Sequence, residues 1–286
     1  MASIILILCI IILTVGKYKL LDNFIKIVIL ILTFSTLFAV GYATNYNAVE
    51  LNVNQIFPDE VSGIIFLAAF MGWMPAPLDV SIWQSIWTKE KLNLNNKIKY
   101  KSALFDFNVG YISTVFLGLC FVALGAFVMF GSGQTFSNNG SEFANQLIKL
   151  YTANLGENVK IFISVAAFTT MLSTTITCLD ASPRAMSQTL KLLNHKKISG
   201  YNTWILIISI VTMIIFVFFE SEMGTLIKIA TILSFITAPI YAIMNYSLVN
   251  SGYMPKKFKL SRTMKFYSIS GIIFLTIFSI WYITLI

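Results

Sequence analysis

The chain has 286 residues, of which 57% are hydrophobic and only 11% are charged. Soluble domains typically carry about 25% charged residues, so the composition excludes a soluble globular protein and predicts an all-α polytopic membrane protein. The formal net charge is +8. Basic residues gathered at one membrane face account for it, so no nucleic-acid partner is expected.

Apolar stretches long enough to cross a bilayer, at about 20 residues each, follow one another along the chain. We expect about eight transmembrane helices, at residues 2–16, 24–43, 62–87, 104–131, 159–182, 203–219, 224–249 and 266–286. The first stretch is short and begins at Met1 with no basic flank. A missing N-terminal portion explains this start better than a signal peptide does, because no basic n-region or clear cleavage site is present.

Basic residues alternate between the loops that connect these stretches. All of the 20 Lys and Arg residues except Lys149, Lys160 and Lys228 fall on one side of the eight-span arrangement. The positive-inside rule makes that side cytoplasmic and places both chain ends outside.

The third stretch carries an interruption, Gly72-Trp73-Met74-Pro75-Ala76-Pro77-Leu78-Asp79. Pro75 and Pro77 each remove a backbone donor and clash with the preceding turn, so an unbroken helix is not expected here. In lipid the freed carbonyls need another partner. A broken helix whose unwound centre lines a cavity is how many secondary transporters build a substrate site, and we expect the same around Met74.

Three carboxylates fall within or beside the predicted spans, where ionisable groups are functional candidates. Asp79 follows the break, as a helix N-cap or as a cation ligand or proton site. Asp106 lies at the start of the fourth span, as a cap or as part of a proton relay. Asp180 precedes Arg184 by four residues, the spacing of a one-face ion pair if the helix continues through Pro183. A gate or proton exit is the alternative for this pair.

Hydroxyl groups and a further proline mark two later spans. The run Ser173 to Thr177, which includes Thr174, either satisfies backbone carbonyls and packs against a neighbouring helix or lines an aqueous path. In the seventh span Thr237 precedes Pro239 by two residues. Pro239 predicts either a kink or a second broken helix beside Met74, and Thr237 is a candidate for the substrate pathway.

The cysteines lie far apart and in no metal-binding spacing, and no nucleophile elbow or phosphate loop is present. The sequence therefore predicts no enzyme activity and no resident cofactor. The thioether of Met74 is a soft ligand that disfavours calcium and magnesium and tolerates manganese and iron.

Three segments resemble the Nramp (natural resistance-associated macrophage protein) family of divalent metal transporters. Residues 16–24 (Gly-Lys-Tyr-Lys-Leu-Leu-Asp-Asn-Phe) resemble the segment entering that family's fifth span. Met71-Gly72-Trp73-Met74-Pro75 resembles its sixth-span Ala-x-x-Met-Pro core, and the hydroxyl run at 173–177 resembles its eighth span. The chain is similar to the fourth to eleventh spans of the family.

The resemblance implies an inverted-repeat fold like that of the bacterial leucine transporter, in one transmembrane domain. Residues 1–60 would end the first repeat, 61–250 would form the second, and 251–286 would add a span. It also implies metal ligands at Met74 and in the backbone around Met71 and Gly72. The first-span Asp-Pro-Gly-Asn motif, which supplies the other half of the family's site, does not occur here. The family's histidine after Met-Pro is replaced by Ala76, and Asp79 is a hypothetical substitute.

The leading interpretation is a transporter of manganese- or iron-like divalent cations, coupled to protons as a symporter and working by alternating access. One alternative is an amino acid or other small organic solute, since Trp73 and Trp83 beside the break suit a bulkier ligand. Another is an inactive truncated remnant. The Ile-, Lys- and Asn-rich composition suggests a bacterial inner membrane, with the lipid bilayer and the transported cation as partners.

Overall fold

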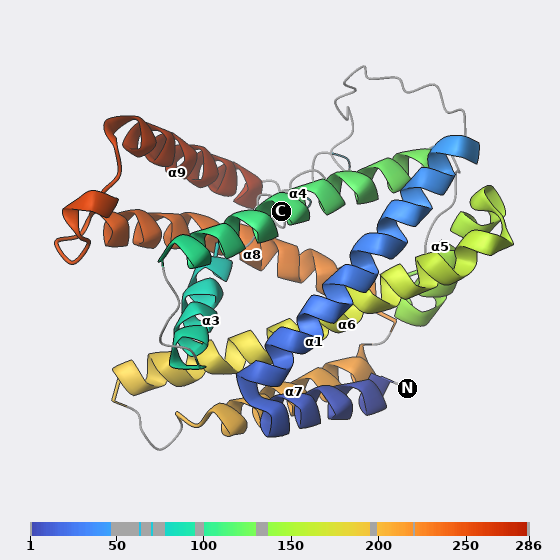
Figure 1. Ribbon diagram of the computed structural model, residues 1–286, viewed down its shortest axis with the longest axis horizontal. Coiled ribbons are helices and arrows are strands. Elements are labelled where there is room, and N and C mark those ends of the chain that lie inside the picture. The colour runs from blue at the N-terminus through green and yellow to red at the C-terminus, as the bar shows by residue number, and fades with distance from the viewer. Residues whose placement is uncertain are drawn as a thin grey trace. The chain divides into compact units, whose positions relative to one another are not determined.

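The computed structural model describes residues 2–46, 63, 70, 78–94, 100–129, 137–194, 199–219 and 221–284. Within these residues all regular structure is helical, and they contain no strand. The helices are α1 (Ala2–Tyr46), α3 (Val80–Leu94), α4 (Tyr100–Val128), α5 (Gly140–Leu155), α6 (Lys160–Leu192), α7 (Tyr201–Phe218), α8 (Met223–Asn250) and α9 (Arg262–Ile283), with short 3-10 turns at Glu157–Val159 and Lys256–Phe258 (Figure 1).

Six stretches of helix among the described residues are long and apolar enough to cross a membrane. They are Tyr18–Thr44, Tyr100–Val128, Glu157–Leu192, Tyr201–Phe218, Met223–Asn250 and Arg262–Ile283, and Ser3–Val15 is a shorter apolar helix. Six of the expected spans are thereby confirmed, and the first is the short helix. The third expected span, 62–87, lies mostly outside the described residues.

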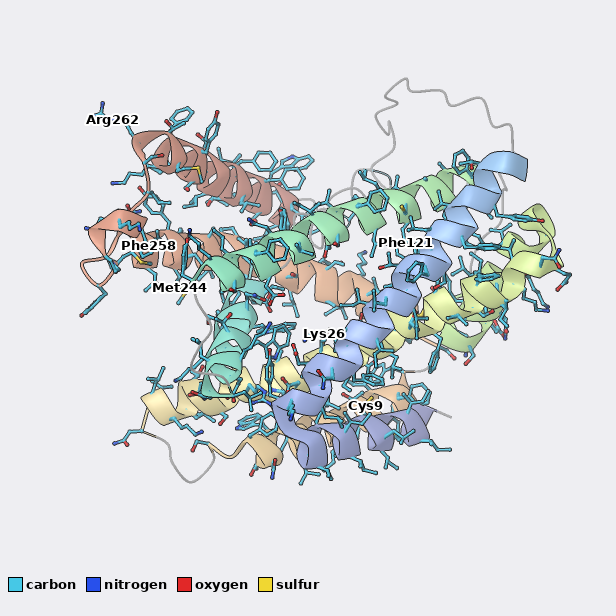
Figure 2. All side chains as sticks on the ribbon, in the orientation of Figure 1. Cys9, Lys26, Phe121, Met244, Phe258 and Arg262 are labelled. Carbon is cyan, nitrogen blue, oxygen red and sulfur yellow. The ribbon has the colours of Figure 1, made fainter. Side chains whose placement is uncertain are left out.

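Large apolar side chains cover the outside of these helices. Ile112 on α4 is 68% exposed, Ile210 on α7 is 59% exposed and Met244 on α8 (labelled in Figure 2) is 59% exposed. A water-soluble protein of this size would bury most such surface, whereas lipid tails solvate it. The chain is therefore an all-α polytopic membrane protein.

The first two expected spans are joined without a loop. α1 is helical from Ala2 to Tyr46, which corrects the expected connection between residues 16 and 24. The residues from Lys17 to Asp22 include good helix formers and no proline, and Lys26 forms an i,i+4 ion pair with Asp22 at 2.5 Å. Figure 1 shows α1 changing direction sharply between its N-terminal part and the remainder.

The chain divides into two compact units, residues 1–52 with 83–223 (unit 1) and residues 53–82 with 224–286 (unit 2). In unit 1 one buried cluster joins the N-terminal part of α1 to α6 and α7, through Leu6, Cys9, Leu13, Leu21, Ile176, Leu179 and Ile205. Cys9 is labelled in Figure 2. A second cluster joins the C-terminal part of α1 to α4, α5 and α6, through Ala39, Ala43, Leu124, Val128, Leu150, Tyr151, Val159 and Ile163. These units do not follow the repeat boundaries expected from the resemblance, which stay a prediction.

In unit 2 α8 packs against α9, and this contact explains the behaviour of Pro239. α8 is helical through Pro239, so the broken helix, one of the two alternatives for this residue, is wrong, and the kink stays a prediction. A proline has no N–H to give to the carbonyl four residues earlier, here that of Phe235. The Ser279 hydroxyl of α9 donates to this carbonyl at 3.3 Å, within a contact formed by the buried Phe235 and Tyr282 rings. α8 therefore keeps its helical path.

Candidate functional site

A buried carboxylate near the end of α6 is the best-connected polar group in the described part of unit 1. Asp180 has 0% of its surface exposed. Its carboxylate accepts hydrogen bonds from the Trp87 indole Nε1 at 2.8 Å, from the Arg184 Nε at 2.8 Å to both oxygens, and from the Tyr201 hydroxyl at 2.5 Å. Three side chains from α3, α6 and α7 thus converge on one charge.

Arg184 is held from several sides. Its Nη1 lies 3.4 Å from Glu90 Oε1 on α3, and its side chain is 12% exposed. The guanidinium carbon lies 4.6 Å from the centre of the Tyr201 ring and 5.9 Å from that of Tyr18, within the range of cation–π attraction. The positive charge is therefore compensated by two carboxylates and two aromatic faces.

The predicted i,i+4 pair of Asp180 and Arg184 is present because α6 continues through Pro183. A buried charge pair is tolerated when further hydrogen bonds compensate it, and here Trp87 and Tyr201 donate to the Asp180 carboxylate while Glu90 lies 3.4 Å from the Arg184 guanidinium. Both carboxylate oxygens are occupied by donors. This arrangement fits the structural interpretation of the pair, in which it joins α3, α6 and α7 at one end of unit 1.

Asp106 does not cap a helix. α4 is already helical from Tyr100, and the Asp106 carboxylate pairs with Lys91 of α3 at 2.6 Å. Its side chain is 63% exposed. The cap expected at Asp106 is therefore wrong, because the helix begins more than one turn earlier than the fourth span was expected to begin.

Asp79 lies directly before α3, as expected. Its backbone carbonyl accepts from Ile82 N at 2.8 Å, so it stands at the start of the helix. Its side-chain Oδ1 is buried and receives no hydrogen bond from any described residue. A buried carboxylate oxygen without a donor is unfavourable unless something else compensates its charge.

A polar contact in unit 2 fixes the start of α3. The Ser81 hydroxyl donates to the Leu78 carbonyl at 2.7 Å and accepts from the Asn245 amide of α8 at 2.9 Å. Asn245 comes one to two turns after Pro239, and its contact with Ser81 lies two residues from Asp79 in sequence. The turn that carries Asp79 is thereby anchored to α8.

The hydroxyls of Thr174 and Thr237 bond within their own helices. Thr174 donates to the Thr170 carbonyl at 2.9 Å, and Thr237 donates to the Leu233 carbonyl at 2.9 Å. Both satisfy backbone acceptors, which is the simpler of the two interpretations of these hydroxyls. A role of either threonine in a substrate pathway stays a prediction.

The residues expected to form the helix break and the metal ligands, Met71, Gly72, Met74, Pro75 and Pro77, lie outside the described residues. Within the described ranges no group of three or more His, Cys, Asp or Glu side chains is arranged to hold a metal ion.

Sequence reasoning did not find Trp87, Glu90, Tyr18 and Tyr201, which surround the Asp180–Arg184 pair. They come from three other segments of the chain, and Trp87 is separated from Asp180 by 93 positions. The available signal was that aromatic residues recur where spans are expected to end, near the membrane interface.

Comparison with known proteins supplies the family. The model of the natural resistance-associated macrophage protein-like (Nramp) family matches residues 1–285. A protein of Pasteurella multocida (strain Pm70), described only as uncharacterized, is 36% identical over 279 residues. The match covers 95% of this chain and 63% of that relative, so the chain spans less than two thirds of the relative's length. No solved structure matches the chain. Because the family match covers almost every residue, the chain belongs to the Nramp family.

Proposed function

We propose that the protein transports divalent metal cations, of the manganese or iron type, by alternating access around the Met74-Pro75 break. Membership of the Nramp family over residues 1–285 supports metal transport as the general activity, and it argues against an enzyme. The observation on the fold that supports a cation is the buried Asp79 Oδ1, which has no donor among the described residues.

Asp79 is suited to act as a cation ligand. A carboxylate oxygen that is withdrawn from water and from N–H donors has its negative charge compensated when a metal ion or a proton binds. The Ser81–Asn245 hydrogen bond holds the adjoining turn, so the carboxylate would meet the ion from a fixed position.

Met74 would add a second, softer ligand five residues earlier in the chain. A thioether together with a carboxylate favours first-row transition metals over calcium and magnesium, which prefer all-oxygen sites. Backbone carbonyls around Met71 and Gly72, freed where Pro75 and Pro77 interrupt the helix, would complete this side of the site.

Proton coupling would also involve Asp79. The histidine that follows Met-Pro in the family is Ala76 here. Asp79 is a carboxylate in the same segment, and it would take the place of that histidine in coupling protons to the metal. The bacterial inner membrane is the proposed location.

The test is uptake of Mn²⁺ into proteoliposomes that contain the protein as its gene encodes it, with an acidic outer solution. Asp79→Asn keeps the shape of the side chain and removes its charge, and we expect uptake to fall about tenfold or more, the loss typical of removing one strong ligand or its support. Met74→Ala should lower Mn²⁺ uptake and weaken competition by softer ions such as Cd²⁺.

Asp22→Asn is the matched control, because Asp22 is engaged with Lys26 on α1 and has no role in the proposed site. Mn²⁺ uptake by this variant should equal that of the unchanged protein. Equal uptake by the Asp79→Asn variant would remove Asp79 from the site. Uptake of an amino acid without any uptake of metal would show that the cargo is an organic solute. Uptake of neither would favour the alternative of an inactive remnant.

A further inference from the structure

A polar cavity of about 450 Å³ lies in unit 1 beside the Asp180–Arg184 pair, and nothing in the proposed transport site accounts for it. Its walls come from the N-terminal half of α1, the end of α3, the end of α6 and the start of α7. These segments carry basic residues of the face that the positive-inside rule makes cytoplasmic.

The cavity is basic. Lys19 of α1 and Lys191 of α6 line it, together with Arg184, and Glu90 is the one acidic residue in its described lining. Glu90 already lies against Arg184. Neither Lys19 nor Lys191 has an ion pair with any carboxylate that the structure describes. Two ammonium groups are therefore available to an anion.

An apolar groove lies near this cavity, between α1 and α7. The groove has a volume of about 420 Å³ and is lined by residues from Ser3 to Ile10 on α1 and from Leu206 to Phe218 on α7. On α1 the cavity lining begins at Leu13, within one turn of Ile10, and on α7 it begins at Asn202, one turn from Leu206. The basic cavity and the apolar groove thus lie one after the other along the same two helices, about one turn apart.

The dimensions match one leaflet of a bilayer. The α1 residues that line the groove and the cavity extend from Ser3 to Lys19, and the part from Ser3 to Thr14 corresponds to about 17 Å at 1.5 Å per residue. One leaflet contributes roughly 15 Å to the hydrocarbon core. A molecule with an anionic head at Lys19 and Lys191 and an aliphatic chain toward Ser3 would fill both parts.

We propose that this composite site binds an anionic phospholipid of the cytoplasmic leaflet. The phosphate lies between Lys19 and Lys191, and one acyl chain lies in the groove between α1 and α7. Basic pockets between helices on the cytoplasmic side of a membrane protein are suited to such head groups. The apolar groove offers a place for an acyl chain, which free phosphate does not have. It therefore favours a lipid over free phosphate as the ligand.

The test measures binding of phosphatidylglycerol to the purified protein in neutral detergent, by native mass spectrometry and by the shift in melting temperature. Phosphatidylcholine and inorganic phosphate are the comparison ligands. We expect phosphatidylglycerol to bind more tightly than either and to raise the melting temperature. Lys19→Gln and Lys191→Gln should each weaken it about fivefold, the effect expected for one basic residue near an anionic lipid.

The control is the double variant Lys101→Gln/Lys265→Gln, which removes two positive charges, one more than each test variant, from exposed positions outside the cavity. Its affinity for phosphatidylglycerol should be unchanged. Ile7→Trp, at an exposed position that lines the groove, should reduce phosphatidylglycerol binding while leaving the lysines intact. Equal binding of phosphatidylcholine would overturn the proposal. So would a loss in the Lys101→Gln/Lys265→Gln variant equal to that in the Lys19→Gln or Lys191→Gln variant, or tight binding of inorganic phosphate that Ile7→Trp does not affect.

Discussion

Asp180 illustrates how a charge is kept inside unit 1. Its two oxygens accept from an indole, a guanidinium and a phenol, which come from α3, α6 and α7. Each donor compensates part of the free energy that the carboxylate loses on leaving water. Both oxygens are occupied by donors, and this favours the structural role of Asp180 over that of a gate.

Asp180→Asn is expected to destabilise the protein strongly. The substitution leaves the Arg184 guanidinium, which is 12% exposed, without its nearest counter-ion. Removing one partner of a buried pair typically costs about 3–5 kcal/mol. The melting temperature of the purified protein, followed by tryptophan fluorescence, would measure this loss.

Asp106→Asn serves as the comparison for that measurement. Asp106 also pairs with a basic residue, Lys91, but its side chain is 63% exposed. An exposed ion pair contributes about 0–1 kcal/mol to stability. The melting temperature of the Asp106→Asn variant should therefore differ little from that of the unchanged protein. If both variants melted alike, burial would not be what makes the Asp180 pair important.

At the scale of single helices, two prolines inside the predicted spans do not end their helices. Pro183 and Pro239 both lie inside continuous helices, α6 and α8. The sequence indicates where a backbone donor is missing, but it does not indicate which residue replaces it. For α8 the replacement is Ser279, which is 44 residues from the carbonyl that it satisfies. Only the packing of α9 on α8 brings the two together.

A double-mutant cycle tests this replacement. Ser279→Ala removes the donor from the Phe235 carbonyl, and we expect it to destabilise the protein by about 1–3 kcal/mol, the penalty for an unsatisfied buried acceptor. Pro239→Ala restores the N–H that can reach the same carbonyl within the helix. In the Pro239→Ala background, Ser279→Ala should therefore cause a much smaller loss.

The quantity to measure is the coupling between the two substitutions, from the melting temperatures of both single variants and the double variant. Strictly additive effects would show that the Ser279 hydroxyl does not compensate for the proline. A coupling of either partner with Thr152 serves as the baseline, because the Thr152 hydroxyl donates to the Ile148 carbonyl within α5.

At the scale of the whole molecule, the membrane-spanning helices could be predicted from sequence because hydropathy is local. Each of the six long spans contains a stretch of high mean hydropathy, and no knowledge of its neighbours is needed to recognise it. The connection between residues 16 and 24 was missed because charged residues suggested a loop, while their helix propensity and the Asp22–Lys26 pair favoured a continued helix.

The candidate sites were less predictable, because side chains far apart in sequence form them. Asp79, Asp180 and Arg184 were recognisable as ionisable groups in or near lipid. Their partners were not, since the Trp87–Asp180 and Asn245–Ser81 bonds join positions 93 and 164 residues apart. No periodicity or spacing rule connects residues across such distances.

The orientation across the membrane yields a prediction for the whole chain. Basic residues gather in alternate loops, so Lys257 should face the cytoplasm and Lys149 should face the outside. In a protein whose Cys9, Cys120 and Cys178 are replaced by alanine, Lys149→Cys should react with a membrane-impermeant maleimide added to intact cells. Lys257→Cys should react only after the membrane is opened.

Both side chains are exposed, so failure to react would not come from burial. The reverse pattern of labelling would show that the chain crosses the membrane in the opposite orientation. It would also place Lys19 and Lys191 at the outer leaflet.

The dependence of α8 on Ser279 bears on where the chain can be shortened. α9 follows the portion expected to form the second repeat, and it could be taken for a dispensable addition. A protein truncated before Arg262 would leave the Phe235 carbonyl facing hydrocarbon tails, where an unsatisfied backbone group costs several kcal/mol. Such a fragment would relieve that exposure by unwinding near Pro239, so the terminal helix keeps the one before it helical through this residue.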